Sequence, residues 1–384
     1  MQNSRRNALK SIAALGAAAA WPPARAQSAN EWVVGQIAPA SGPQGPGSTQ
    51  QTNGIALAFA KANAAGGVGG RMLKLVSRDD KYLPAEAPKQ FDALFEAGLK
   101  PIALVGAYGT DNTDALIKSP SFVRSGLALV GGRTGATVLR APANRQVFHL
   151  RASYRDEIEK IVEQLANNGV KEIGMVYQAG GFGQDCVAGL AASMQKRGLT
   201  PARGAEIDVN GARLPAAVKA VMESTPAALI IAASAVPATA FLAAFRKAGG
   251  NTQLFGISTV DPDLLISTLG AAGARGIMLT QVMPDQVQKQ LGFTRDFLAD
   301  LKQYGEGRVQ PGFAAAEGYL VGRVFTEALR RAAPNPTPAK IAEALEGMNQ
   351  YDLGGISINF SRTDHVGTRY VDTAVINGAG KLQY

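Results

Sequence analysis

The segment Trp32-Val33-Val34-Gly35-Gln36-Ile37 decides the fold, because this mostly apolar run has the length and composition of a buried strand. A loop rich in glycine, proline and serine follows at 41–48. From 49 to 64 apolar residues recur at helical spacing and would form one face of a helix: Ile55, Ala58, Phe59 and Ala62. A second strand is predicted at 72–76, after two glycines that end the helix. The whole unit predicts a right-handed βαβ crossover with parallel strands.

The same alternation continues along the chain and predicts two α/β lobes. The first succession continues with a helix at 84–97 and strands at 102–105 and 127–130. The alternation starts again near Phe148, with segments at 155–168, 172–177, 185–197, 218–224, 228–233, 238–248 and 253–257. Two helices (313–332 and 337–348) and two strand-like segments (356–360 and 370–376) follow. Strands separated by helices of about 10–15 residues indicate parallel sheets.

The composition is that of an ordinary globular chain of 384 residues, 46% hydrophobic and 18% charged. This length favours two domains over one. A single cysteine, Cys186, excludes a disulfide framework and a cysteine-built metal site. With only two histidines, His149 and His365, a histidine-built metal centre is not expected either. We therefore expect no metal and no cofactor.

The first 26 residues predict a cleaved export signal. A basic stretch at 4–10 precedes an alanine-rich apolar run at 12–21, and the small-x-small pattern that follows indicates cleavage after Ala26. The apolar run is shorter than the roughly 20 residues of a stable membrane anchor. The adjacent Arg5 and Arg6 indicate a twin-arginine signal, although Ala8 replaces a bulkier apolar residue and leaves the general secretory route open. We therefore expect a periplasmic protein without stable membrane insertion.

The formal net charge of +9 does not indicate a nucleic-acid partner. The predicted signal carries four basic residues and no acidic one, so the mature chain is less basic than the whole. Lysines and arginines are not interleaved with aromatic residues in a cluster typical of a nucleic-acid surface. Solvated surface charge explains the remainder, and we expect no binding to nucleic acid.

Catalytic motifs are missing from the sequence, and we do not expect an enzyme. There is no phosphate loop, no dinucleotide fingerprint, no nucleophile elbow and no zinc-protease helix motif. Cys186 lies early in a predicted helix, where the helix dipole lowers thiol pKa values. A buried structural thiol is the interpretation that we favour for this residue.

Two polar clusters invite catalytic interpretations, and each has a simpler explanation. Asp364 and His365 near Ser361 suggest a hydrolase triad, but triad residues normally come from separate segments, so a turn between two late strands is favoured. Asp79 and Asp80 suggest paired carboxylates, but adjacent strand residues point to opposite faces. A turn at the end of the second strand is favoured for this pair.

Several short motifs, taken in order, resemble the leucine/isoleucine/valine-binding protein family. They are found at 34–43 (VGQIAPASGP), 63–71 (NAAGGVGGR), 78–80 (RDD), 105–106 (VG), 151–154 (RASY) and 317–319 (EGY). The resemblance covers essentially the whole mature chain, and the order and spacing of the motifs are more specific than any one of them. Members of this family are periplasmic receptors of ATP-driven importers with the type I binding-protein fold.

The resemblance implies an α/β fold with two doubly wound parallel-sheet lobes, joined by three hinge strands, and a ligand cleft between the lobes. The crossings are expected near 148–151, 277–282 and 353–357. Lobe 1 then comprises 27–148 and 282–354, and lobe 2 comprises 151–277 and 357–384. At the carboxyl ends of parallel strands, loops and helix N-termini present backbone N–H groups that bind a carboxylate without a basic side chain.

The resemblance also implies a set of ligand-binding residues, carried over by position. They lie in loops that face the expected cleft: Ser41, Tyr108, Gly109, Thr110, Arg133, Thr134, Gly135, Tyr154, Phe182 and Phe313. Thr110 stands where the family has a serine hydroxyl that binds the ligand carboxylate, and a helix N-cap role is equally compatible with this position. For Phe182 and Phe313, ordinary packing is the alternative to a ligand contact.

Departures from the family pattern concern the group that holds the ligand ammonium. The family's amino-acid receptors have an acid after the strand matched by 254–257, whereas this chain has Ser258 there and Asp261 three residues later. The accompanying tyrosine falls on Ala235. Arg133 enters a loop facing the cleft and, if directed inward, offers a planar fork suited to a carboxylate. The combination favours an aromatic or medium-chain carboxylate without an α-ammonium over leucine or valine.

The function implied is that of a periplasmic solute-binding subunit of a branched-chain-amino-acid-type ABC importer. It would bind a small amino acid or carboxylate by lobe closure and deliver it, as a monomer, to an inner-membrane ABC permease. The alternative is a ligand-sensing regulator or receptor of the amide-sensor type on the same fold. The export signal favours the importer subunit, and neighbouring permease and ATPase genes would distinguish the two.

Overall fold

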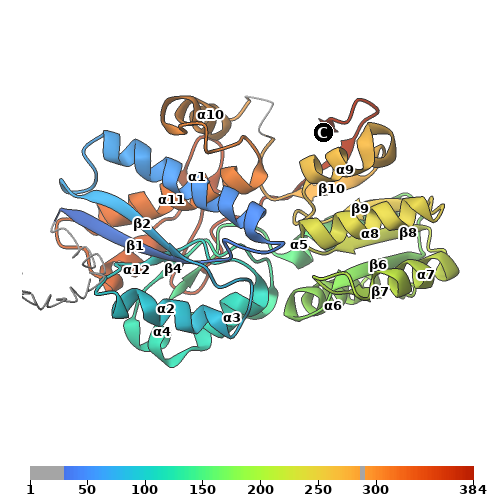
Figure 1. The fold of residues 1–384 in the computed structure, drawn as a ribbon, viewed down its shortest axis with the longest axis horizontal. Helices are drawn as coiled ribbons and strands as arrows, with labels where there is room; N and C mark the ends of the chain where they lie inside the picture. Colours follow the sequence, from blue (N-terminus) through green and yellow to red (C-terminus); the bar gives the residue numbers. More distant parts are fainter. Residues whose placement is uncertain (1–29, 286–289) are drawn as a thin grey trace, which may run out of the picture.

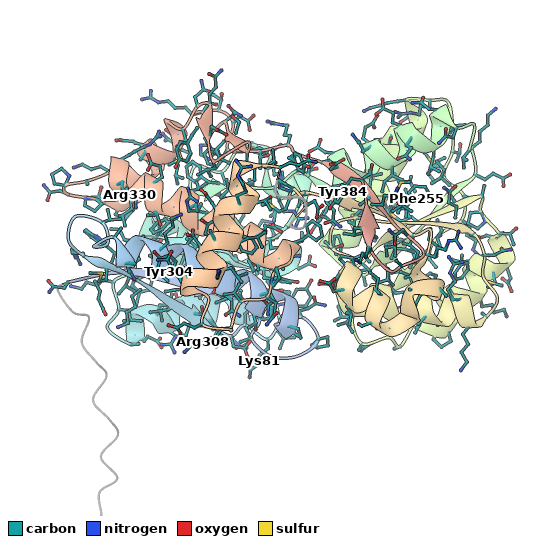
Figure 2. The ribbon with its side chains drawn as sticks, turned by 90° about the horizontal axis from the view of Figure 1, so that it is seen from above. Lys81, Phe255, Tyr304, Arg308, Arg330 and Tyr384 are labelled. Carbon is teal, nitrogen blue, oxygen red and sulfur yellow. The ribbon has the colours of Figure 1, made fainter. Side chains whose placement is uncertain are left out.

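The computed structural model describes residues 30–285 and 290–384, which form two α/β lobes side by side (Figure 1). The predicted export signal lies outside the described residues. Each lobe contains one main sheet with helices on both faces, so the predicted fold class is confirmed. Seen from above in Figure 2, Tyr304 and Arg330 mark the first lobe, and Phe255 and Tyr384 mark the second.

The first sheet is wholly parallel, with the strand order β2-β1-β3-β4-β5. Its strands are β1 (Glu31–Ile37), β2 (Met72–Arg78), β3 (Leu104–Val105), β4 (Leu129–Val130) and β5 (Val147–Phe148). The strand that the opening segment predicts is β1, which pairs with β2 along its whole length and is buried from Val33 onward. The strand order reverses between β1 and β3, and at such a switch point the loops diverge and leave a crevice.

The helices of the first lobe are α1 (Gly45–Ala64), α2 (Glu86–Glu96), α3 (Thr110–Lys118), α4 (Pro120–Ser125), α10 (Gly292–Tyr304), α11 (Phe313–Arg331) and α12 (Pro338–Glu346). Helix α1 begins four residues before the predicted start because Pro46 fits its first turn, where the missing N–H is not needed. The backbones of α1 and α11 lie unusually close, since a Cβ on Gly318 would overlap the carbonyl of Gln51. This close packing fixes the amino-terminal end of α11 against the first lobe.

The second sheet has the strand order β14-β13-β10-β9-β8-β6-β7. Its strands are β6 (Ile173–Gln178), β7 (Ala205–Ile207), β8 (Ala228–Ala232), β9 (Gln253–Gly256), β10 (Met278–Gln281), β13 (Asp372–Ile376) and β14 (Leu382–Gln383). Strands β6 to β10 are parallel and repeat the order of the first sheet, while β13 and β14 add an antiparallel edge. The helices of this lobe are α5 (Tyr154–Asn167), α6 (Gly181–Gln195), α7 (Leu214–Ser224), α8 (Ala235–Lys247) and α9 (Pro262–Ala274).

The segment of the third expected crossing, at 353–357, packs in the first lobe. The short strands β11 (Tyr351–Asp352) and β12 (Ser357–Ile358) pair with each other, and Ile356, Ile358 and Phe360 lie in the first-lobe core. The chain then returns beside the first crossing, where Val366 forms a bridge with His149. It returns to the second sheet only at β13, because the apolar residues before it are buried in the first lobe. We therefore propose that the lobe boundary falls between Val366 and Asp372.

No helix within residues 30–285 and 290–384 combines the length and the apolar character needed to cross a membrane.

Candidate functional site

The carboxyl ends of the parallel strands of both sheets face the junction of the lobes, where two adjoining chambers lie. The small chamber has a volume of about 20 Å³ and is lined by Tyr82, Tyr108, Gly109, Thr110, Arg133, Tyr154, Phe182, Ser234 and Thr259. The large chamber has a volume of about 140 Å³, and its walls include Gln50, Arg133, Ser258, Val260, Asp261, Pro262, Asp263, Gln281, Gln310, Pro311 and Phe313. Arg133 lines both chambers, so they meet at its side chain.

The loops after β3 and β4 bring two threonine hydroxyls together beside the small chamber. The loops are held side by side because Arg133 N donates to the Ala107 carbonyl at 2.6 Å and Tyr108 forms a bridge with Arg133. As a result, the hydroxyl oxygens of Thr110 and Thr134 lie 2.8 Å apart, and both residues are buried. Gly109, with a φ of 85°, precedes α3 in a conformation that favours glycine. The first N–H groups of α3 have no acceptor within their helix and offer an anion site at this end.

Aromatic rings form the other walls of the small chamber. The rings of Tyr154 and Phe182 lie 4.7 Å apart between their centroids, and those of Tyr82 and Tyr108 lie 6.2 Å apart. Burial raises the pKa of the Tyr108 phenol, so its hydroxyl remains neutral. The remaining volume holds roughly one water-sized group.

The Asp79–Asp80 pair forms the predicted strand-end turn, and this turn positions Tyr82. The carboxylate of Asp79 accepts the backbone N–H of Lys81 at 2.8 Å, and that of Asp80 accepts the N–H of Tyr82 at 2.9 Å. Lys81 and Tyr82 have φ values of 55° and 58°, in the left-handed region that non-glycine residues rarely adopt. The two carboxylates thus stabilise a strained backbone that places Tyr82 in the chamber wall.

Arg133 points inward and is only 11% exposed. Its Nη1 lies 3.6 Å from Oε2 of Glu317, an ion pair too long for a hydrogen bond. Among the described residues, this buried Nη1 has no hydrogen-bond acceptor. A buried donor without a partner is unfavourable, so the geometry favours an acceptor supplied by a ligand.

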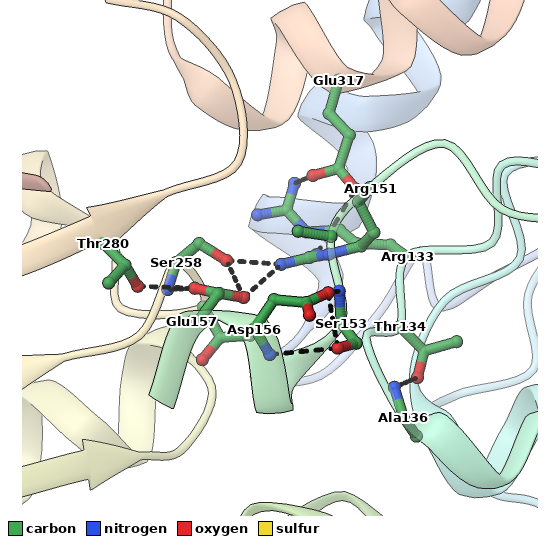
Figure 3. A network of polar contacts seen from close by, with 12 residues as sticks. Arg133, Thr134, Ala136, Arg151, Ser153, Asp156, Glu157, Ser258, Thr280 and Glu317 are labelled. Carbon is green, nitrogen blue, oxygen red and sulfur yellow. Dashed lines mark hydrogen bonds and ion pairs between the residues drawn. The ribbon is translucent and has the colours of Figure 1, made fainter. Parts of the chain in front are cut away.

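Behind Arg133, a buried ionic network spans the first crossing between the lobes (Figure 3). The guanidinium of Arg151 lies between Oε1 of Glu317, at 3.4 Å, and Oε1 of Glu157, at 3.5 Å. Glu157 also accepts the backbone N–H of Ser258 at 2.7 Å and the hydroxyl of Thr280 at 2.6 Å, and Ser258 receives a hydrogen bond from Arg151. Burial alone would lower the pKa of Arg151, but the two carboxylates raise it, so the guanidinium remains charged.

This network surrounds Ser258, the position at which the sequence resemblance leads one to expect an acid. The carboxylate of Glu157 lies directly behind Ser258, and Arg151 balances its charge. A negative charge is therefore present near the expected position, but it is already paired within the protein.

Two acidic residues at the start of α9 line the large chamber. Asp261 caps this helix, with Oδ1 accepting the Leu264 N–H at 2.9 Å. Partial burial and the neighbouring charge of Asp261 raise the pKa of Asp263. The chamber wall also holds a hydrogen-bond donor, in contrast to these two carboxylates. It is Nε2 of Gln281, at the end of β10, which is buried and has no partner in the described part of the chain.

The lobes are in direct contact around the two chambers. Asp111 Oδ1 on α3 accepts the Gly181 N–H at the start of α6, at 2.9 Å. Gln44 Nε2 donates to Ser234 Oγ at 2.7 Å, and the Thr137 N–H donates to Asp185 Oδ2 at 3.0 Å. These bonds join the two lobes and enclose the chambers, so this is a closed arrangement.

The structure brings together most of the residues that the sequence indicates. Those that line a chamber or, like Thr134, bond to one that does are Tyr108, Gly109, Thr110, Arg133, Thr134, Tyr154, Phe182, Ser258, Asp261 and Phe313. Ser41, Gly135 and Ala235 lie outside the two chambers that the described residues form. Ser41 donates to Asp79 at 2.7 Å on an exposed loop, and Gly135 packs against the Tyr154 ring.

The structure does not assemble the triad considered for the late turn. The hydroxyl of Ser361 accepts the Asp364 N–H at 3.0 Å. The ring of His365 stacks on Phe148 at 4.1 Å and its Nδ1 lies 3.0 Å from the Asn144 carbonyl. Cys186 is buried and burial raises its pKa, as in a structural thiol. Within the described residues, no cluster of His, Cys, Asp and Glu side chains could hold a metal ion.

Sequence reasoning missed several residues that line the chambers: Tyr82, Ser234, Thr259, Asp263 and Gln281. Their common signal is position, since each lies at or just after the carboxyl end of a parallel strand, or in the first turn that follows it. Glu157 and Glu317 lie on helices and carry no such signal.

The chain is similar to periplasmic binding proteins in both sequence and structure. The periplasmic binding protein family model matches residues 31–381. A substrate-binding periplasmic protein from Ralstonia solanacearum is 31% identical, with a TM-score of 0.86 and coverage of 91% of this chain and 99% of that chain. A possible leucine/isoleucine/valine-binding protein from Rhodopirellula baltica SH 1 is 27% identical, with a TM-score of 0.86 and coverage of 95% and 97%.

A more distant solved structure shares the fold alone. It is a branched chain amino acid ABC transporter from Thermus thermophilus with bound valine, 19% identical, with a TM-score of 0.81 and coverage of 93% of this chain and 95% of that chain. No curated protein matches the sequence.

Proposed function

Since this chain belongs to the periplasmic binding protein family, we propose that it is the solute-binding subunit of an ABC importer of the branched-chain-amino-acid type. One observation supports this role above others. The paired hydroxyls of Thr110 and Thr134, the amino-terminal end of α3 and the inward Nη1 of Arg133 all lie at one place between the lobes. Together they form a set of donors for an anionic group.

The ligand that fits these donors is a small carboxylate, either an amino acid or a simpler acid. One carboxylate oxygen receives the helix N–H groups and one threonine hydroxyl, since the other hydroxyl donates to its threonine partner. The second carboxylate oxygen receives Arg133. The small chamber admits roughly one water-sized group, so one carboxylate oxygen enters it and the other stays beside Arg133, where the two chambers meet. The body of the ligand then occupies the large chamber beside Phe313 and Val260.

Lobe closure is the proposed means of binding. The donors for the carboxylate belong to the first lobe, whereas Phe182, Ser234 and Ser258 belong to the second. A ligand held by the first lobe therefore adds contacts with the second only when the lobes close about their crossings. The hydrogen bonds from the Gly181 N–H to Asp111 and from Gln44 to Ser234 form at the same time.

The proposed setting is the periplasm, with export directed by residues 1–26 through the twin-arginine route and delivery to an inner-membrane ABC permease. The Thermus thermophilus neighbour, named as an ABC transporter protein with bound valine, supports this partner class. Replacing Arg5 and Arg6 with lysine is expected to leave uncleaved precursor in the cytoplasm. Normal processing of this variant would show that the general secretory route suffices.

The function is tested by a ligand screen on the mature protein. Thermal-shift measurements with amino acids, aliphatic carboxylates and aromatic carboxylates are expected to identify a binder, which at 100 times its Kd stabilises the protein by about 2.7 kcal/mol. Small-angle scattering with that binder is expected to show a smaller radius of gyration than the free protein. A saturated protein with an unchanged radius would contradict closure, and no stabilisation by any of the acids would contradict the function.

A further inference from the structure

Two buried donors in the walls of the large chamber have no hydrogen-bond acceptor among the described residues. Gln281 is only 1% exposed, and its Nε2 has no hydrogen-bond partner among the described residues. Arg133 contributes a second such donor, Nη1. Both side chains line the chamber. Because a buried amide or guanidinium donor without an acceptor is unfavourable, the chamber favours an occupant that brings an acceptor.

The same chamber also presents carboxylates as acceptors. Asp261 uses Oδ1 to cap α9 and Asp263 follows it in the first helical turn, and both line the chamber. Unlike Glu157 and Glu317, they form no ion pair with Arg133 or Arg151 in the described residues. An occupant is therefore favoured if it also donates a hydrogen bond and if it carries no negative charge near these two residues.

Few polar groups meet both requirements. An ammonium group donates to the aspartates but offers no lone pair to Gln281. A second carboxylate accepts from Gln281 but is repelled by the aspartates and has no proton to donate. A hydroxyl group or a carboxamide both accepts and donates, so either one satisfies both walls at once.

The volume of the large chamber limits the size of the part of the ligand that it can hold. At about 140 Å³ it is close to the roughly 150 Å³ of an apolar cavity that accepts benzene. Apolar surface is available from Phe313, Pro311 and Val260. A ring-sized body therefore fits between the carboxylate end in the small chamber and the polar wall of the large one.

From these walls we infer that the ligand is a small carboxylate with a ring-sized body that extends past Arg133. The ring carries a hydroxyl or carboxamide group, which binds between Gln281 and the two aspartates of α9. This inference rests on the proposed function. Gln281 and Asp263 then act as specificity-determining residues. They select the far end of the ligand, whereas Thr110, Thr134 and Arg133 hold its carboxylate.

Matched benzoates test this selection, because the rigid ring holds the two polar ends at fixed separations. Calorimetric titration of the mature protein compares benzoate with its 3- and 4-hydroxy, 3- and 4-carbamoyl, and 3- and 4-carboxy derivatives. The best hydroxy or carbamoyl derivative is expected to bind at least tenfold more tightly than benzoate, and the dicarboxylates more weakly than benzoate. In Gln281→Leu the advantage of that derivative over benzoate is expected to fall below threefold.

Two further variants separate selection from a general loss of binding. Asp263→Asn, at an exposed position that lines the large chamber, is expected to reduce the difference in affinity between benzoate and the dicarboxylates. Gln253→Leu, an exposed position at the start of β9 outside both chambers, is expected to leave every affinity unchanged.

The outcomes distinguish this inference from the proposed function. Benzoate binding as tightly as the best derivative, or a dicarboxylate binding most tightly, would overturn the selection and leave carboxylate binding intact. An unchanged preference in Gln281→Leu would overturn the role of that residue. Failure of every benzoate to bind would overturn the inference, and the function would fail with it only if the broad acid screen also gave no binder.

Discussion

Glu157→Gln is expected to destabilise the protein more than any exposed charge change, because it removes the charge that faces Arg151 across the lobe junction. Glu157 is fully buried and accepts hydrogen bonds from Ser258 and Thr280. Glutamine keeps one oxygen but places an NH₂ group where the second oxygen accepted these donors. The variant thus loses an ion pair and at least one charge-assisted hydrogen bond.

The size of the loss follows from the burial of the partner that remains. Removing one member of a buried ion pair destabilises a protein by about 3–5 kcal/mol. Arg151 keeps Glu317 at 3.4 Å, so its charge is still partly balanced and the lower end of that range applies. We therefore expect a loss of about 3 kcal/mol, which for a domain of this size lowers Tm by roughly 6–12 °C.

Urea unfolding followed by circular dichroism measures the free energy of unfolding, and calorimetry measures Tm. Glu163→Gln is the matched control, since Glu163 is exposed on the same helix and its change is expected to stay within about 0.5 kcal/mol. A double-mutant cycle with Arg151→Met is expected to give a coupling energy of at least about 1 kcal/mol. If Glu157→Gln behaves like Glu163→Gln, the network does not depend on charge, and the reasoning from burial is refuted.

Three further predictions concern binding and pH. Arg133→Ala is expected to weaken carboxylate binding more than tenfold, about 1.4 kcal/mol, with little change in the Tm of the free protein; calorimetric affinity equal to wild type would refute its role. Asp111→Ala removes the acceptor of the Gly181 N–H and is expected to weaken ligand binding and enlarge the ligand-bound radius in scattering, whereas unchanged values would show that this bond does not hold closure. Burial lowers the pKa of His149 well below 6.5, so below about pH 6.5 the unfolded state binds more protons and the free energy of unfolding falls. The decrease in the free energy of unfolding from pH 7 to pH 5 is expected to be smaller in His149→Gln than in wild type. Equal decreases in the two proteins would exclude His149 as the source.

The fold could be predicted because strand and helix periodicity is local. The opening strand and helix are found as β1 and α1, and the repeated order predicted both lobes. Helix α9 was not predicted because it is apolar on most sides and Gly270 interrupts it with a φ of 70°. Strand β7 has only three residues, too few to show an alternating pattern. The later third crossing that we propose was not predicted, because alternating apolar residues at 356–360 do not reveal which core receives them.

The candidate site, too, could be predicted only in part. Thr110 and Arg133 could be predicted because the family resemblance matches their loops to ligand-binding loops, and such loops follow parallel strands whose carboxyl ends meet at one edge of the sheet. The partners of Arg133 and Ser258 could not, because they depend on contacts between distant segments. Glu157 and Ser258, for example, are 101 residues apart and lie on different elements.

The bonds between the closed lobes have a consequence for the empty protein. Those from Asp111, Gln44 and Thr137 each join polar groups that water can bind equally well once the lobes separate. Parting these contacts therefore uncovers hydrophilic rims rather than an adhesive apolar face. The open form also exposes the aromatic walls of the small chamber, so the polar rims confine the apolar surface to the chamber and are expected to limit association at high protein concentration.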